Sequence, residues 1–168
     1  MSEFTLLLVD DSPNILKAMA RVFRPEGYNL LLAGSAKEAI EIMTNEKVDL
    51  IITDENMPGL SGTDLLRVVR ETHPFVVRFM VTGADDIEVA KNAINNGEIY
   101  RFFTKPWDDF ELLVCVKQAL AYRMVLLENE KLKKRIIDDE AALRDLERQY
   151  PGIADKRLSE DGAYIIDN

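Results

Sequence analysis

Cysteine and histidine are nearly absent from the 168 residues, with one of each. A single cysteine excludes an internal disulfide framework and fits a reducing compartment. Cys115 stands in the apolar stretch ELLVCVKQAL, which predicts a buried packing role. His73 directly precedes a proline at an expected helix end, so we assign it no catalytic role.

Long hydrophobic runs are also missing. No stretch approaches the roughly 18 apolar residues of a membrane span, and the start MSEFTLLLVDD lacks the basic segment and the cleavage site of a secretory signal. Positive charge is scarce, with 21 basic against 30 acidic residues and a net charge of −9, which repels nucleic-acid phosphates. We therefore expect a cytoplasmic protein without a membrane segment or direct nucleic-acid contacts, whose partners are proteins.

The chain does contain a regular alternation of apolar runs and amphipathic stretches of helical spacing. The apolar runs cover residues 4–9, 29–33, 48–53, 75–81 and 99–104. Capping-box spacings indicate three helix starts, at Ser35 with Glu38, at Asp108 with Glu111 and, more weakly, at Ser61 with Asp64. The five-fold alternation predicts an α/β fold with helices on both faces of a parallel sheet, whose ligands bind beyond the carboxyl ends of the strands.

Chemically informative side chains follow four of these runs. Asp10 and Asp11 directly follow the first run, Asp54 follows the third, Thr82 the fourth and Lys105 the fifth. Because the carboxyl ends of parallel strands meet at one edge of a sheet, we expect these side chains to converge. Adjacent carboxylates repel each other, and three carboxylates with one lysine suit Mg²⁺. Each position alone also fits a helix cap, a turn or an ordinary strand residue, but their joint occurrence favours the metal site.

This order and spacing of motifs over residues 1–121 resembles the receiver domain of two-component response regulators. The resemblance implies a flavodoxin-like (βα)5 doubly wound parallel sheet with strand order 2-1-3-4-5. It also implies that Asp54 accepts a phosphoryl group from a histidine kinase or phosphotransfer protein. Mg²⁺ would be held by Asp10, Asp11, Asp54 and the backbone carbonyl of Asn56.

The same resemblance assigns roles to the remaining site residues and describes a signalling module, not an enzyme. Lys105 would draw charge off the transferring oxygens, and its peptide bond to Pro106 would be cis. Thr82 and Phe102 would form the switch, in which the threonine binds the phosphoryl group and the aromatic ring rotates inward. Phe102 lacks the hydroxyl that many relatives carry at this position, so no readout depends on that hydroxyl.

The segment IYRFFTKPW resembles receivers that are often joined to HD-GYP cyclic-dinucleotide phosphodiesterases. That metal enzyme needs several histidine ligands, and the chain has no histidine after residue 121. The downstream output is therefore not encoded here. We expect the signalling surface on the face of the fourth and fifth helices and the strand between them, near Tyr100 and Trp107.

No glycine or proline occurs between Trp107 and Pro151, which predicts a helix far longer than a sheet requires. A heptad seam runs through Tyr122, Val125, Asn129, Leu132, Ile136, Asp139, Leu143, Leu146 and Tyr150. It predicts a parallel homodimeric coiled coil over residues 122–150, in which Asn129 fixes the register and Asp139 is a flaw. A single amphipathic helix, folded back or solvated, remains the alternative, and residues 151–168 form a short tail.

Three other interpretations stay open. An aspartyl phosphatase of the haloacid-dehalogenase class also uses aspartate, Mg²⁺ and lysine, but it needs Asp-x-Asp after its first strand, where this chain has adjacent aspartates. A flavin-binding module would lack Lys105. The chain could also be the N-terminal receiver of a longer regulator with an output domain after Asn168.

Overall fold

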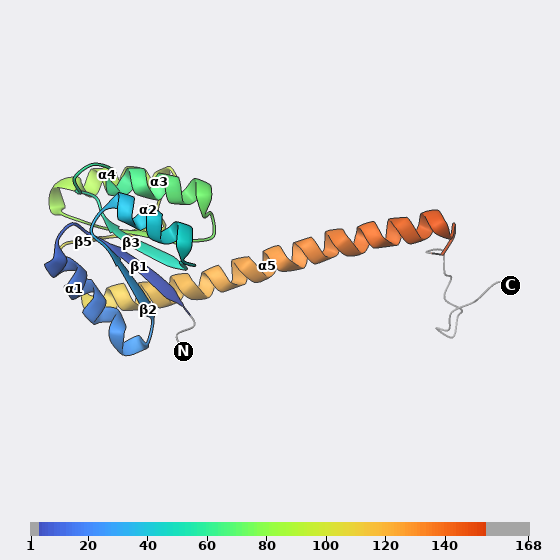
Figure 1. The fold of residues 1–168 in the computed structure, drawn as a ribbon, viewed down its shortest axis with the longest axis horizontal. Helices are drawn as coiled ribbons and strands as arrows, with labels where there is room; N and C mark the ends of the chain where they lie inside the picture. Colours follow the sequence, from blue (N-terminus) through green and yellow to red (C-terminus); the bar gives the residue numbers. More distant parts are fainter. Residues whose placement is uncertain (1–3, 154–168) are drawn as a thin grey trace. The chain divides into compact units, whose positions relative to one another are not determined.

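A computed structural model describes residues 4–153, which contain a five-stranded parallel sheet and its helices (Figure 1). The elements follow in the order β1 (Thr5–Val9), α1 (Pro13–Phe23), the 3₁₀ helix η1 (Arg24–Glu26), β2 (Asn29–Ala33), α2 (Ala36–Asn45), β3 (Leu50–Asp54), α3 (Gly62–Thr72), β4 (Val77–Thr82), the 3₁₀ helix η2 (Ala84–Asp86), α4 (Ile87–Asn95), β5 (Arg101–Thr104) and α5 (Asp109–Gln149). The strand order is β2-β1-β3-β4-β5. This confirms the predicted flavodoxin-like fold with its long final helix.

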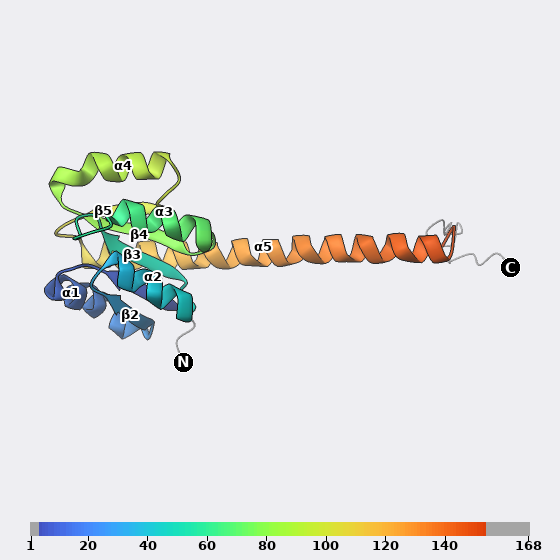
Figure 2. The same cartoon turned by 45° about the horizontal axis from the view of Figure 1, so that its top comes forward.

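The sheet separates two hydrophobic cores because successive strand residues point to opposite faces. Leu7 and Ile51 face a core that α2, α3 and α4 complete, whereas Leu8 and Ile52 face one that α1 and the start of α5 complete. Figure 1 shows this division, with α2, α3 and α4 on one side of the strands and α1 on the other, and the turned view in Figure 2 shows α4 well separated from α1. Burial on both faces explains why the inner strands β1, β3 and β4 are continuous apolar runs, whereas the edge strands β2 and β5 are partly exposed.

Two strands begin and end later than the apolar runs predicted. β3 starts at Leu50 and ends at Asp54, and β4 starts at Val77 and ends at Thr82. A turn in which the Val76 N–H donates to the His73 carbonyl (3.0 Å) precedes β4 and delays its start. With these bounds, Asp54 and Thr82 are the last residues of their strands.

The predicted helix starts are confirmed by their capping hydrogen bonds. The side-chain oxygens of Ser35, Ser61 and Asp108 accept the backbone N–H groups of residues 38, 64 and 111, at 3.2, 3.1 and 2.7 Å. Each bond satisfies an N–H that has no partner within its own helix.

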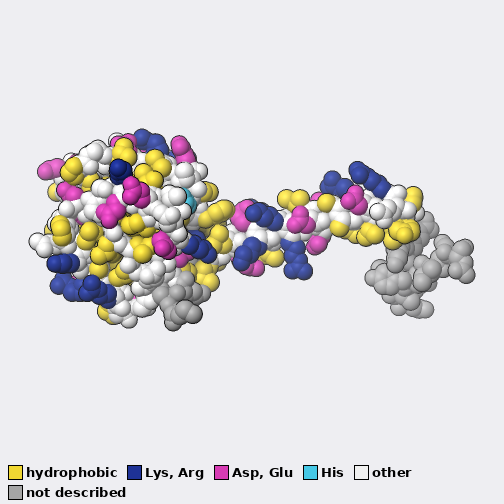
Figure 3. Space-filling view, viewed as in Figure 1, with side chains coloured by type: hydrophobic (Ala, Val, Ile, Leu, Met, Phe, Trp, Pro, Cys, Tyr) yellow, Lys and Arg dark blue, Asp and Glu magenta, His cyan; other side chains and the backbone are white. Residues whose placement is uncertain are grey.

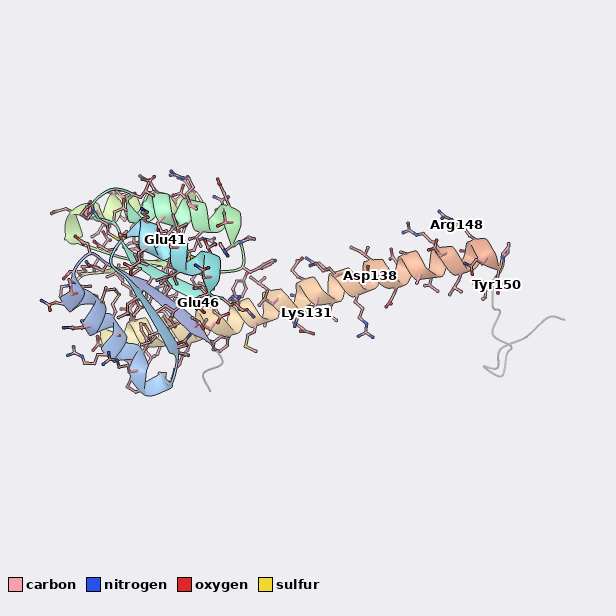
Figure 4. The ribbon with its side chains drawn as sticks, in the orientation of Figure 1. Glu41, Glu46, Lys131, Asp138, Arg148 and Tyr150 are labelled. Atoms are coloured by element: carbon pink, nitrogen blue, oxygen red, sulfur yellow. The ribbon has the colours of Figure 1, made fainter. Side chains whose placement is uncertain are left out.

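The chain divides into two compact units, with the boundary between Val125 and Leu126. In the first unit, α5 buries one face that includes Leu112, Cys115 and Leu120. In the second unit, side chains such as Lys131, Asp138 and Arg148 project from the helix, as Figure 4 shows. Most of the predicted tail, residues 154–168, lies outside the described residues. No helix in the described part of the chain is long and apolar enough to cross a membrane.

Candidate functional site

Three charged side chains meet at the carboxyl edge of the sheet. Asp10 follows β1, Asp54 ends β3 and Lys105 follows β5. The Lys105 Nζ lies 2.9 Å from Asp10 Oδ2 and 3.0 Å from Asp54 Oδ1. Both carboxylates are buried, so the ammonium group acts as their counter-ion in a partly desolvated setting. The structure thus brings together side chains that the sequence places far apart.

Asp11 completes an acidic cluster beside this ion pair. One carboxylate oxygen each from Asp10, Asp11 and Asp54 lies within 4.8 Å of the others. Asp11 is exposed, and Asp10 also accepts the Ser12 N–H at 2.8 Å through Oδ1. Three carboxylates with one lysine leave net negative charge, and a few carboxylate oxygens with open water positions are the environment that Mg²⁺ prefers. The side chains present therefore fit a magnesium ion.

Burial and charge set the protonation of the central pair. Burial raises the pKa of Asp54 above its ordinary value, against the opposing effect of the Lys105 hydrogen bond and charge. For Lys105, burial acts to lower the pKa, but hydrogen bonds and charges from Asp10 and Asp54 outweigh it and raise the pKa. Lysine therefore stays protonated, while ionised Asp54 is costly until a further cation joins it.

Thr82 offers an unpaired hydroxyl at the same edge. The register pairs Asp54 with Val81, so Thr82 lies one residue further along β4. Its Oγ1 is buried and, among the residues that the structure describes, stands out as a buried side-chain oxygen without a hydrogen-bond partner. A buried hydroxyl without a partner is unfavourable. It is available to an oxygen-rich group that enters the site.

Three further predicted residues surround this centre. The Lys105–Pro106 peptide bond is cis. Phe102 is partly buried and packs against the core that contains Met80 and Ala90. The Asn56 side chain is exposed, and its amide donates a hydrogen bond to the carboxylate of Asp86.

Two residues that shape this edge, Gly62 and Glu55, lie outside the motifs that predicted the site. Gly62, the first residue of α3, lies so close to Asp54 that an added Cβ would be 2.1 Å from the Asp54 carbonyl oxygen. Glu55 is buried beside Asp54 and accepts hydrogen bonds from Thr63. A glycine directly after a serine N-cap was the available signal for close approach, whereas nothing in the sequence marked Glu55 as buried.

The fold and this arrangement of side chains define a receiver-type domain, and comparison with known proteins agrees. The chain matches the response regulator receiver domain over residues 6–117. It therefore belongs to the response regulator receiver family, as the sequence motifs predicted.

The chain is similar to regulators of several bacteria. It is 35% identical over 126 residues to the hydrogenase transcriptional regulatory protein HoxA of Bradyrhizobium diazoefficiens, covering 75% of this chain and 26% of that protein. It is 28% identical over 170 residues to a putative NtrX-like response regulator of Rickettsia bellii, covering 99% of this chain and 35% of that protein. The chain thus spans about a third or less of these curated relatives.

A solved structure gives the same result. The signal receiver domain of an HD domain-containing protein from Pseudomonas fluorescens Pf-5 superimposes with a TM-score of 0.71 and 35% identity. The match covers 76% of this chain and 94% of that chain. The similarity therefore includes nearly all of that receiver domain.

Proposed function

We propose that this chain is a phosphorylation-activated response regulator that accepts a phosphoryl group on Asp54. The donor is the phosphohistidine of a histidine kinase or phosphotransfer protein. The observation that carries the proposal is the position of Lys105, which bridges Asp10 and Asp54 at 2.9 and 3.0 Å. Asp10, Asp11, Asp54 and the backbone carbonyl of Asn56 would hold Mg²⁺.

The transfer follows from the placement of these groups. An oxygen of Asp54 attacks phosphorus, the phosphorus–nitrogen bond of the donor breaks, and its electron pair stays on the imidazole, which binds a proton. Lys105 places its ammonium group where charge develops on the phosphoryl oxygens, so this chain contributes positioning and charge neutralisation. Bound Mg²⁺ supplies further positive charge to those oxygens.

The switch uses the unpaired hydroxyl. Thr82 donates a hydrogen bond from its hydroxyl to an oxygen of the new phosphoryl group, and Phe102 moves into the space that the threonine leaves. Phe102 lies on β5, so this movement alters the α4-β5-α5 face, which is our proposed signalling surface. The chain acts as a signalling module and not as an enzyme.

The output lies in other protein segments or partners. HoxA is named as a transcriptional regulatory protein, and this chain spans only about a third or less of the two curated relatives described above. We place the domain in the cytoplasm. Its net charge of −9 argues against direct nucleic-acid contacts.

Residues 122–150 form a parallel coiled-coil homodimer in this proposal. In the second unit, Leu132, Ile136 and Leu143 are 48%, 58% and 59% exposed. Figure 3 shows hydrophobic side chains between the charged ones along this part of the helix. An isolated helix gains little stability from an exposed apolar stripe, and a second copy of the same stripe would bury it.

Intact-protein mass spectrometry after incubation with acetyl phosphate tests the phosphoacceptor. We expect one added phosphoryl group in the presence of Mg²⁺ and none after its removal with a chelator. Asp54→Asn should not be labelled, and Lys105→Ala should bind Mg²⁺ but fail to signal. Labelling of Asp54→Asn equal to that of the unaltered protein would refute the assignment, and steady hydrolysis of phosphomonoesters would favour the phosphatase alternative.

A further inference from the structure

Glu55, the residue after the proposed phosphoacceptor, has a buried carboxylate that is tied to the next helix. Its Oε2 accepts two hydrogen bonds from Thr63, one from the backbone N–H and one from the hydroxyl, both at 2.8 Å. The residue is 8% exposed. A buried carboxylate is unfavourable unless hydrogen bonds satisfy it. The two bonds from Thr63 therefore offset the free-energy cost of burying Glu55.

These bonds complete the first turn of α3. The N–H of Gly62 donates to the Glu55 carbonyl at 3.0 Å, and the N–H of Asp64 donates to Ser61 Oγ at 3.1 Å. Together with the N–H of Thr63, the first three N–H groups of the helix are satisfied, two of them by Glu55. The start of α3 is therefore held by Glu55, the residue that follows the proposed phosphoacceptor.

The same contacts close the loop that runs from Glu55 to Thr63. Hydrogen bonds between Glu55 and residues 62 and 63 join the two ends of the loop. Asn56 directly follows Glu55, so it lies next to these bonds. Gly62 approaches the Asp54 carbonyl so closely that even a Cβ would not fit. The close approach of Gly62 to the Asp54 backbone and the hydrogen bonds of the Glu55 carboxylate together restrict how far the loop can shift.

We propose that Glu55 is a positioning residue for the Mg²⁺ site. Its carboxylate holds the start of α3 against the end of β3, which fixes the loop and keeps the Asn56 carbonyl in the place where the metal requires it. This inference rests on the proposed function, because the role of Asn56 belongs to that proposal. Groups that orient metal ligands from outside the ligand set commonly change metal affinity by about 10- to 100-fold when they are removed.

Titration of the full chain with Mg²⁺, followed by amide chemical shifts, measures affinity without any phosphoryl transfer. We expect Glu55→Leu to raise the half-saturating Mg²⁺ concentration about tenfold. Glu55→Gln keeps an acceptor oxygen for both Thr63 donors and should stay within about twofold of the unaltered protein. Thr63→Val, which removes one donor, should weaken binding, and Thr63→Ser should restore it.

A purely structural role predicts a different pattern. Each variant would then lose stability towards urea without a change in the half-saturating Mg²⁺ concentration. Glu38→Leu is the matched control, since Glu38 also accepts a backbone N–H, that of Gly34 at 2.7 Å, near the start of α2. It should leave Mg²⁺ affinity unchanged.

The outcomes separate this inference from the proposed function. If the unaltered protein is labelled on Asp54 but Glu55→Leu and Thr63→Val bind Mg²⁺ normally, the positioning role is refuted and the proposed function stands. If the unaltered protein binds no Mg²⁺ and is not labelled, both are refuted. Should Glu55→Leu fail to fold, the pair Thr63→Val and Thr63→Ser decides alone.

Discussion

Arg123 on α5 and Asp49, the residue before β3, form a buried ion pair with Nη1 and Oδ1 2.9 Å apart. Arg123 Nε also donates to the Phe75 carbonyl at 2.7 Å, and Asp49 Oδ2 accepts the Thr5 N–H at 2.8 Å. These contacts lie where β1, β3 and β4 begin, at the opposite end of the sheet from Asp54. They fix α5 to the sheet just before the helix leaves the first unit.

Removing one partner of this pair should destabilise the first unit strongly. Arg123→Met leaves the Asp49 carboxylate buried without its counter-ion, and we expect a loss of about 3 kcal/mol in the free energy of unfolding. Urea denaturation followed by circular dichroism measures it. Arg148→Met makes the same change in an exposed pair with Asp145, and should cost less than about 1 kcal/mol. Equal losses in both variants would contradict a structural role for the buried pair.

Gly62→Ala should destabilise the protein through a steric clash. The added Cβ would lie 2.1 Å from the Asp54 carbonyl oxygen, so α3 or the end of β3 has to shift. We expect a loss of about 3 kcal/mol in urea denaturation, at the upper end of overpacking effects, and slower labelling of Asp54. Gly83→Ala is the matched control, because a Cβ there meets nothing within 4 Å, and its effect should stay within about 0.5 kcal/mol.

The Asp54 carboxylate should make resting stability depend on pH when Mg²⁺ is absent. Burial raises its pKa in the folded state, so the folded protein binds this proton more tightly than the unfolded chain does. The contribution of Asp54 therefore becomes less favourable as pH rises from its unfolded pKa through the raised folded pKa. Asp54→Asn should be more stable than the unaltered protein at pH 7, and this advantage should shrink on acidification.

Thermal unfolding of both proteins across the acidic to neutral range, with a chelator present, measures this difference. Added Mg²⁺ should stabilise the unaltered protein more than Asp54→Asn, because the ion offsets the charge that destabilises the folded state. A constant difference in stability at every pH would show that ionisation of Asp54 is not its cause.

Thr82→Val should separate resting stability from signalling. Valine keeps the shape of threonine and removes the buried oxygen that has no partner, so we expect the free energy of unfolding to rise by about 1 kcal/mol. Asp54 should still be labelled. The change in the Phe102 environment on phosphorylation should be lost, as seen in its aromatic NMR signals. A destabilised Thr82→Val protein would indicate a hydrogen bond for this hydroxyl in the resting state.

The fold was predictable because the inner strands β1, β3 and β4 are buried on both faces and therefore appear as apolar runs. The side chains of the candidate site were predictable for a related reason, since Asp10, Asp54 and Lys105 follow directly after such runs. The carboxyl ends of parallel strands lie at the same edge of the sheet, so side chains that follow successive strands come close together. The resemblance to receiver domains then supplied the strand order.

The contacts that support the site were not predictable in this way. Glu55 looks like any charged loop residue in the sequence, and its carboxylate is buried where Thr63 of α3 donates two hydrogen bonds to it. Arg123 and Asp49 pair across elements that are distant in the chain, and Arg123 lies in a helix where charged residues are common. Such pairings depend on packing between elements, which neither periodicity nor motif spacing encodes.

The proposed coiled coil of residues 122–150 can be tested by its effect on oligomeric state. Sedimentation equilibrium should show the intact chain as a dimer and the double variant Leu132→Asp with Ile136→Asp as a monomer. Both side chains are exposed in the single chain and lie on the seam, where buried aspartates would lack partners.

A substitution outside the seam tests whether the dimer is lost because the substituted residues lie on the seam or only because the helix becomes less hydrophobic. Ile137 is 64% exposed, slightly more than its neighbour Ile136, but it stands one position off the heptad seam. Ile137→Asp should therefore remain dimeric with nearly unchanged affinity. Because α5 is continuous from Asp109 to Gln149, the seam begins on the same helix that packs against the sheet. A monomeric intact protein, or a loss of dimer in Ile137→Asp equal to that in the double variant, would refute the seam.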